Sequence, residues 1–160
     1  MFIQNIKKFI YLIESQITGN PERAAAKLEI SNRTLHNYCH LIKNELNAPL
    51  AYDKFRETYY FSTEGSLKWH WVEGIEFLSD GYHFKNKRLS SLNDIVNMAL
   101  AKNTGGSKIL ASKLKISERN LFYYIDLLRT EFNVPIYFDR QVNSYVIQNR
   151  GFLSFRWQIN

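Results

Sequence analysis

One segment of the chain occurs twice, and this repetition limits the fold more than any other feature. Arg119 lies 86 positions after Arg33, and the same offset relates the two copies without a gap. The matching pairs include Gly19 and Gly105, Leu28 and Leu114, Ser31 and Ser117, Tyr38 and Tyr124, Pro49 and Pro135, Asp53 and Asp139, Gly65 and Gly151, and Trp71 and Trp157. Similarity over this length indicates duplication of one folding unit. We therefore predict two domains of the same fold, residues 1–71 and 92–160, joined by a linker over residues 72–91.

The first repeat opens with two predicted helices. Apolar residues recur at helical spacing from about Ile3 to Ile17, which predicts an amphipathic helix. Asn20 and Pro21 then form a helix start, because asparagine is a good N-cap and proline suits the first helical position. A second, alanine-rich helix is expected over Glu22–Leu28.

A third helix follows a tight turn, which predicts a helix-turn-helix. Ser31 is its expected N-cap, since a serine hydroxyl can accept a hydrogen bond from the first helical turn. One stripe at spacings of four, three and four is expected to be buried: Leu35, Cys39, Ile42 and Leu46. The opposite face carries Arg33, Thr34, His36, Asn37, His40 and Lys43. Such side chains read base edges or hold phosphates. In the second repeat, Leu121, Ile125, Leu128 and Phe132 follow Ser117 in the same way.

Strand-like segments follow the third helix. The runs Pro49–Lys54 and Tyr59–Phe61 flank a polar tip and predict a hairpin. Residues 67–71 alternate apolar and polar side chains, so a third strand is expected there, with a helix starting near Leu67 as the alternative. A helical piece is expected around Ile75–Leu78. Four aromatic residues are expected to be core residues that close the wings: Trp69, Trp71, Phe155 and Trp157. The predicted fold class is mainly α with small β-hairpin wings (α+β), arranged as two tandem winged helix-turn-helix domains.

Charge and cysteine content restrict the class of protein. There are 21 Lys and Arg against 15 Asp and Glu, with a net charge of +6 and a pI near 9.4. The first repeat holds nine basic and seven acidic residues and the second nine and five, so a nucleic-acid surface requires clustering of the basic ones. The single cysteine fits a reducing compartment. The sequence shows neither a signal peptide nor a membrane span of about 20 apolar residues, so we expect a soluble, cytoplasmic protein without membrane partners.

Two motifs carry a resemblance to a known family. Ser31-Asn32-Arg33-Thr34-Leu35 opens the third helix, and Pro49–Lys54 forms the strand after it. Ser117–Leu121, with Asn120 in place of threonine, and Pro135–Arg140 repeat both motifs. Each repeat resembles the winged helix-turn-helix of bacterial regulators of the deoxyribonucleoside-repressor type, and the DNA-binding domain of regulators with a WYL effector domain. The resemblance implies DNA binding through the third helix. It departs from both families because two winged helices fill this chain and no effector domain follows; tandem winged helices also occur in protein-bridging scaffolds of chromosome-condensing complexes.

The resemblance and the polar face together identify candidate DNA-binding residues. The N-terminal turn of a recognition helix enters the major groove, where arginine can bind guanine or phosphate with two hydrogen bonds. The candidates are Ser31, Asn32, Arg33, Thr34, His36, Asn37, His40, Lys43, Lys54, Arg56, Arg119, Asn120, Tyr123 and Arg140. The alternative for all of them is a solvated helix end and a solvated wing tip. Lys85, Lys87 and Arg88 in the linker are either phosphate contacts or a solvated charge run.

The second repeat is less suited to a groove. Phe122, Tyr123, Asp126 and Arg129 occupy the positions of His36, Asn37, His40 and Lys43. A carboxylate repels phosphate, and exposed aromatic side chains favour protein contacts. This face is therefore a candidate contact with a second copy of the chain, with another protein or with the first repeat.

Metal and catalytic chemistry are not expected. His36 and His40 are one helical turn apart, but Cys39 falls on the stripe expected to be buried and no further ligand is evident. Glycine-rich phosphate loops, activated nucleophiles and paired carboxylates are not recognisable. We expect a transcriptional regulator that binds double-stranded DNA without catalytic residues, cofactor or metal. The rival hypothesis is an interaction scaffold for protein partners.

Overall fold

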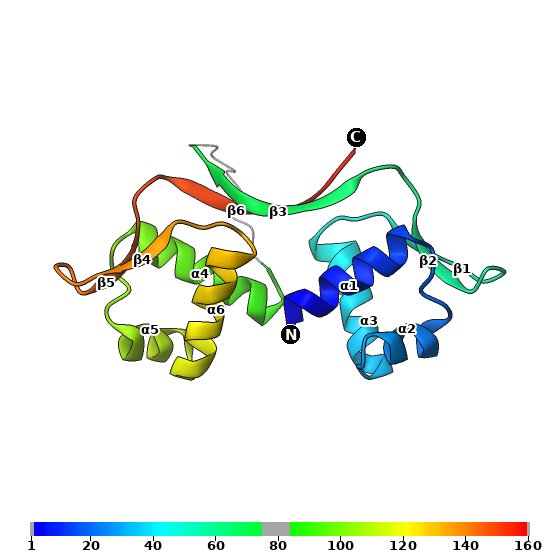
Figure 1. Ribbon diagram of the computed structural model, residues 1–160, viewed down its shortest axis with the longest axis horizontal. Coiled ribbons are helices and arrows are strands. Elements are labelled where there is room, and N and C mark those ends of the chain that lie inside the picture. Colours follow the sequence, from blue (N-terminus) through cyan, green and yellow to red (C-terminus); the bar gives the residue numbers. More distant parts are fainter. Residues whose placement is uncertain (1, 75–83, 160) are drawn as a thin grey trace. The chain divides into compact units, whose positions relative to one another are not determined.

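The computed structural model describes residues 2–74 and 84–159, and its α-helices and strands are labelled in Figure 1. The first repeat contains α1 (Phe2–Glu14), α2 (Pro21–Lys27), α3 (Asn32–His40), a π-helical turn η1 (Leu41–Glu45), β1 (Leu50–Asp53), β2 (Thr58–Phe61) and β3 (Ser66–Glu73). The second contains α4 (Lys87–Leu100), α5 (Ser107–Leu114), α6 (Glu118–Thr130), β4 (Ile136–Asp139), β5 (Ser144–Ile147) and β6 (Gly151–Gln158). Helices followed by a hairpin occur twice, which confirms the α+β fold class. The helical piece expected around Ile75–Leu78 lies outside the described residues.

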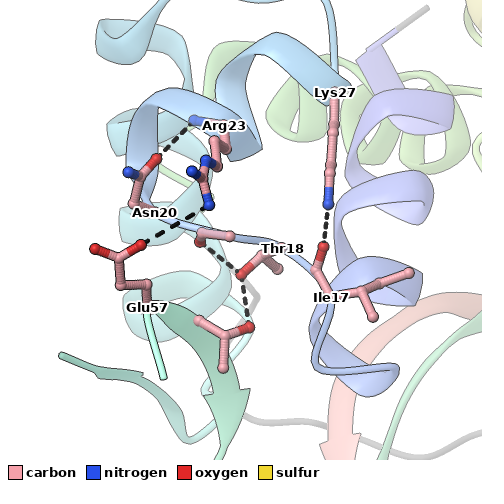
Figure 2. A network of polar contacts seen from close by, with 8 residues as sticks. Ile17, Thr18, Asn20, Arg23, Lys27 and Glu57 are labelled. Carbon is pink, nitrogen blue, oxygen red and sulfur yellow. Dashed lines mark hydrogen bonds and ion pairs between the residues drawn. The ribbon is translucent and has the colours of Figure 1, made fainter. Parts of the chain in front are cut away.

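Hydrogen bonds at the helix starts agree with the sequence. The Asn20 side chain accepts from the backbone N–H of Arg23 at 2.9 Å, and proline follows it at the first helical position (Figure 2). Ser31 Oγ accepts from the N–H of Thr34 at 3.2 Å. Helix α1 ends at Glu14, earlier than expected, because Gln16 adopts a left-handed conformation with φ of 53°. Ile17 therefore lies outside the helix and is half exposed.

Buried hydroxyl groups fasten the loop after the first helix of each repeat to the hairpin. Thr18 Oγ1 lies 2.9 Å from Thr58 Oγ1 and accepts from the N–H of Tyr59 at 2.8 Å. In Figure 2, a dashed line marks the hydroxyl contact that Thr18 makes with the hairpin. In the second repeat, Thr104 Oγ1 lies 2.9 Å from Ser144 Oγ and accepts from the N–H of Tyr145 at 2.7 Å. The duplication thus extends to buried polar contacts, in which the hydroxyls of Thr18 and Thr104 each satisfy a backbone donor of the hairpin.

The structure divides into two compact units, and each includes strand residues from the other repeat. One unit is Met1–Lys68 with Arg156–Asn160, and the other is Trp69–Phe155. The hairpins β1–β2 and β4–β5 are antiparallel, and β3 pairs with β6 in a third two-stranded sheet. Helix α4 begins at Lys87, so the connection after β3 is shorter than the linker expected from the sequence. Residues 66–73 form a strand, which excludes the alternative of a helix starting near Leu67.

Two tryptophans show how each unit is completed. In the first unit, the backbone N–H of Trp157 donates to the carbonyl of Leu46 at 3.3 Å, and its ring packs on Phe61 with centroids 4.4 Å apart. In the second unit, the N–H of Trp71 donates to the carbonyl of Phe132 at 2.8 Å. Each tryptophan therefore donates its backbone N–H to a carbonyl just after the last helix of the repeat to which it does not belong in sequence.

Glycine permits this packing at one position in each repeat. A Cβ atom on Gly65 would lie 2.7 Å from the Trp157 ring, and one on Gly151 would lie 2.3 Å from the Trp71 ring. Both distances are far shorter than a carbon–carbon contact. Both repeats have glycine at this position because an indole ring occupies the space that a side chain there would need.

Candidate nucleic-acid interface

The face of α3 that was predicted to be polar is exposed in the first unit. The exposed candidates are Ser31, Asn32, Arg33, His36, Asn37, His40 and Lys43. Thr34 is half-buried, and its hydroxyl lies 2.9 Å from that of Ser31. Leu35 and Tyr38 are buried on the opposite face. Within its unit, the helix therefore presents its cationic and amide side chains to solvent.

One prediction on the buried stripe is wrong. Cys39 is only half-buried, whereas Tyr38 is 6% exposed and packs edge-on against Phe2 with centroids 5.8 Å apart. The helix widens into η1 after His40, so that the N–H of Leu46 donates to the carbonyl of Leu41, five residues earlier. The buried stripe of α3 runs through Leu35 and Tyr38 rather than through Cys39, and the Phe2 ring of α1 packs on Tyr38. Beyond His40, the π-helical turn changes the spacing of the residues that follow.

A groove of about 310 Å³ runs beside the exposed face in the first unit. Its lining comes from α3, η1, β1 and β2: His36, Cys39, His40, Lys43, Asn44, Leu50, Ala51, Tyr52 and Tyr59. It brings three candidates together, namely His36, His40 and Lys43. Sequence reasoning missed Asn44 and Tyr52. Asn44 directly follows the candidate Lys43 in the sequence, and this adjacency could have indicated it. Nothing local in the sequence indicates that Tyr52 borders the groove.

The thiol of Cys39 contributes no charge to this groove at neutral pH. Burial raises the pKa of the thiol to about 11, although a hydrogen bond with Tyr59 acts in the opposite direction. The thiolate, not the thiol, is the nucleophile and the metal ligand. Within residues 2–74 and 84–159, no three His, Cys, Asp or Glu side chains are grouped in a way that could hold a metal ion.

The wing of the first unit ends in a structured tip. Asp53 Oδ1 accepts from the backbone N–H groups of Phe55 at 2.8 Å and of Arg56 at 3.1 Å. Lys54 and Arg56 are exposed, and the Phe55 side chain between them is fully exposed. Glu57 at the tip forms an ion pair with Arg23 of α2 at 3.9 Å. Figure 2 shows these two side chains facing one another. The wing thus presents two cations, and sequence reasoning missed the exposed aromatic ring between them.

The equivalent surface of the second unit differs in chemistry. Arg119 and Asn120 are exposed on α6, Arg140 is exposed at the wing tip, and Tyr123 is half-buried. Arg129, which matches Lys43, is engaged instead, since its Nε donates to the carbonyl of Ile136 at 2.9 Å. Large apolar side chains are exposed in this unit: Ile109, Phe122, Tyr137, Phe138 and Val142. This unit therefore brings together fewer cations and more apolar surface than the first.

The three linker cations lie at or near a helix start. Lys85 is exposed before Asn86, whose side chain caps α4, and Lys87 and Arg88 occupy the first turn of that helix. None of the helices in the described part of the chain is long and apolar enough to cross a bilayer.

Comparison with known proteins yields no relative from which a function could be transferred. No family model matches the chain, and no significant similarity to a curated protein or to a solved structure was found. Function therefore has to be argued from the residues and their arrangement.

Proposed function

We propose that the chain is a sequence-specific double-stranded DNA-binding protein that regulates transcription. The observation that carries this proposal is the exposed face of α3, where Arg33, His36, Asn37, His40 and Lys43 all reach solvent. Arginine, histidine and asparagine side chains offer the donors and acceptors that base edges in the major groove match. The resemblance of both repeats to the winged domains of deoxyribonucleoside-repressor-type and WYL-type regulators supports the same conclusion.

The N-terminal turn of α3 is the part proposed to enter the major groove. Ser31 and Thr34 form the capped end of the helix, and Arg33 projects from it. A recognition helix contacts bases mainly through this turn. Arg33 is therefore assigned to a guanine edge or a phosphate, and His36 and Asn37 to the bases that follow.

The wing and the end of the helix are proposed to hold the DNA backbone. Lys54 and Arg56 are exposed at the wing tip, and Lys43 lies at the groove between η1 and β1. Contacts to phosphate fix the orientation of a protein on the duplex without reading its sequence. These three cations therefore set affinity, while α3 sets specificity.

A selection of bound duplexes from a random pool, followed by gel shifts in rising salt, tests the proposal. We expect an enriched motif and binding that weakens steeply with salt, because counterions are released from the duplex. Arg33→Ala should weaken binding to the selected duplex roughly tenfold or more. Lys8→Ala is the matched control, since Lys8 is an exposed cation of α1 in the same unit. Binding that is indifferent to salt and to Arg33→Ala contradicts the proposal.

The second candidate function is a protein-interaction scaffold built from tandem winged helices. The exposed apolar side chains of the second unit favour it, in particular Phe122 on α6 and Tyr137 and Phe138 on β4. A scaffold binds no duplex at low salt but self-associates or captures a partner through this surface. Sedimentation analysis of Phe122→Ser, with Phe55→Ser on the first wing as the control, separates this function from the first.

A further inference from the structure

A second cavity, of about 510 Å³, lies in the second unit. It is bounded by the first turns of α4, the connection between α5 and α6, and the first turns of α6. Its lining residues are Lys87, Arg88, Ser91, Lys115, Ile116, Ser117, Asn120 and Tyr124. The sequence suggests Lys87 and Arg88 as phosphate contacts or solvated cations, but it does not indicate that Lys115 and Tyr124 lie beside them.

The lining carries three positive charges and no carboxylate. Lys87 and Arg88 come from one helix, and Lys115 comes from a turn 27 residues beyond Arg88. Their side chains are exposed and face one concave surface, so they raise the positive potential there and favour the approach of an anion. The nearest acid in sequence, Glu118, accepts a hydrogen bond from the Ser107 hydroxyl at 2.8 Å and is not part of the lining.

The remaining lining side chains add hydrogen-bond donors. Ser117 and Asn120 lie at the start of α6, and Tyr124 presents a phenol on the next turn of the same helix. Burial raises the pKa of the Tyr124 hydroxyl and the charge of Arg88 acts against that shift, so the phenol stays protonated and able to donate at neutral pH. A guanidinium, two ammonium groups and these donors match the several acceptor oxygens of a phosphate.

The first repeat shows that the fold does not require this basic cavity. At the positions of Arg88 and Lys115 it has Phe2 and Glu29. Phe2 is 7% exposed and packs against Tyr38, the counterpart of Tyr124. The same framework is thus closed by an aromatic pair in one repeat and lined by cations in the other.

We propose that the cavity of the second unit binds a phosphate group. Two sources share this chemistry: the phosphodiester backbone of duplex DNA and a free phosphorylated small molecule. With DNA as the source, the inference rests on the proposed function; with a free ligand it does not. Arg88 and Lys115 are the residues that carry most of the binding.

Lys115→Glu is the variant of choice because the first repeat shows that the backbone accepts it. Lys115 adopts φ of 55°, and its counterpart Glu29 adopts φ of 56°. Lys108→Glu is the matched control. It makes the same change of charge on α5, it also introduces the residue that the first repeat has at that position, Glu22, and Lys108 is not in the lining. Arg88→Gln is a second variant that tests the cavity from α4.

The first experiment titrates inorganic phosphate and pyrophosphate into the full chain at constant ionic strength, followed by amide NMR shifts. We expect saturable shifts at residues 115–121, affinity reduced roughly tenfold or more by Lys115→Glu and by Arg88→Gln, and no change with Lys108→Glu. The absence of saturation with both anions, together with the DNA result below, overturns the proposal. Equal losses in Lys115→Glu and Lys108→Glu also overturn it, because they indicate bulk charge rather than a site.

The second experiment identifies the source of the phosphate with the selected duplex. A backbone contact predicts that Lys115→Glu lowers the salt dependence of DNA binding by about one released ion and that free phosphate competes. A free ligand predicts saturable phosphate binding and DNA binding that Lys115→Glu does not change. If the chain binds phosphate but no DNA, the proposed function fails and this inference stands. If it binds neither, or binds DNA with no effect of Lys115→Glu and no phosphate saturation, the inference fails.

Discussion

The two repeats have similar interiors and differ in the side chains that they expose. Both cap the third helix with a serine, at Ser31 and Ser117, and both use a buried threonine, Thr18 or Thr104, to hold the hairpin. The exposed faces of α3 and α6 have diverged, one to cations and histidines and the other to aromatic residues and an acid. The interior is limited by packing and hydrogen-bond satisfaction, whereas a solvated face is free to acquire a new ligand. The two copies therefore present different surface chemistry on one framework.

The largest effect is expected where the repeats complete one another. Trp157→Ala should destabilise the first unit by about 3 kcal/mol, because it removes a large aromatic side chain from contact with Phe61. Trp71→Ala should destabilise the second unit instead. Hydrogen exchange of amides in α1 and α4 measures the two units separately. His70→Ala, at an exposed position of β3, is the control. If Trp157→Ala instead lowered protection in α4, or Trp71→Ala lowered it in α1, each tryptophan would stabilise its own repeat, and the packing described above would be refuted.

The buried hydroxyl contacts should be equivalent in the two repeats. Thr18→Val leaves the N–H of Tyr59 without its acceptor, and Thr104→Val does the same to Tyr145. We expect each to lower the free energy of unfolding by about 1–3 kcal/mol. Urea unfolding measures both, with the exposed Thr63→Val as a reference. If only one of the two variants lowered the free energy of unfolding, the buried hydroxyl contacts would not be equivalent in the two repeats.

Two arginines at matching positions test whether the repeats differ in DNA binding. Arg33→Ala should weaken binding to the selected duplex by about 1–3 kcal/mol, and Arg119→Ala should weaken it less than threefold. The reason is that Arg33 stands among other cations and amides on α3, whereas Asp126 and Phe122 share the α6 face. Fluorescence anisotropy at fixed salt measures both variants. Equal losses would mean that both repeats read bases, and the distinction between them would have to be abandoned.

The smallest effect is the pH dependence of the first unit above neutrality. Burial raises the pKa of Cys39 from 9.0 to about 11, so the folded state holds the proton more tightly than the unfolded state does. The resulting stabilisation is complete below pH 9 and is lost as pH rises from 9 to 11. Cys39→Ala should remove this part of the alkaline decline, measured by urea unfolding at pH 8 and pH 10. The second repeat has Ile125 at this position, and Ile125→Ala should leave the pH dependence unchanged.

Local signals made the elements predictable, and contacts between distant residues did not. Asn20, Pro21 and Ser31 act on the turn beside them, so the helix starts and the hairpins follow from short stretches of sequence. The destination of Trp157 does not, because Leu46 and Phe132 offer alternative docking sites and duplication makes the sequence around them alike. The Tyr38 ring packs against Phe2 of α1, and the periodicity within α3 does not indicate this contact.

The candidate site was predictable only in part. The exposed face of α3 followed from the spacing of its apolar residues. The groove beside this face could not be predicted, because its lining includes Tyr52 and Tyr59, which the pairing of β1 with β2 brings together. The basic cavity of the second unit combines α4 with a turn far along the chain. A comparison of the repeats position by position, Phe2 with Arg88 and Glu29 with Lys115, would have pointed to it.

The exchange of tryptophans has a consequence for the history of the chain. A single ancestral copy with the same docking surface would have needed a second molecule to supply its missing strand, and such pairs come apart on dilution. Joining two copies in one polypeptide replaces that encounter with an intramolecular one, at an effective concentration in the millimolar range for a short tether. Fusion also allows the two halves to diverge in sequence, which two copies of the same molecule cannot do.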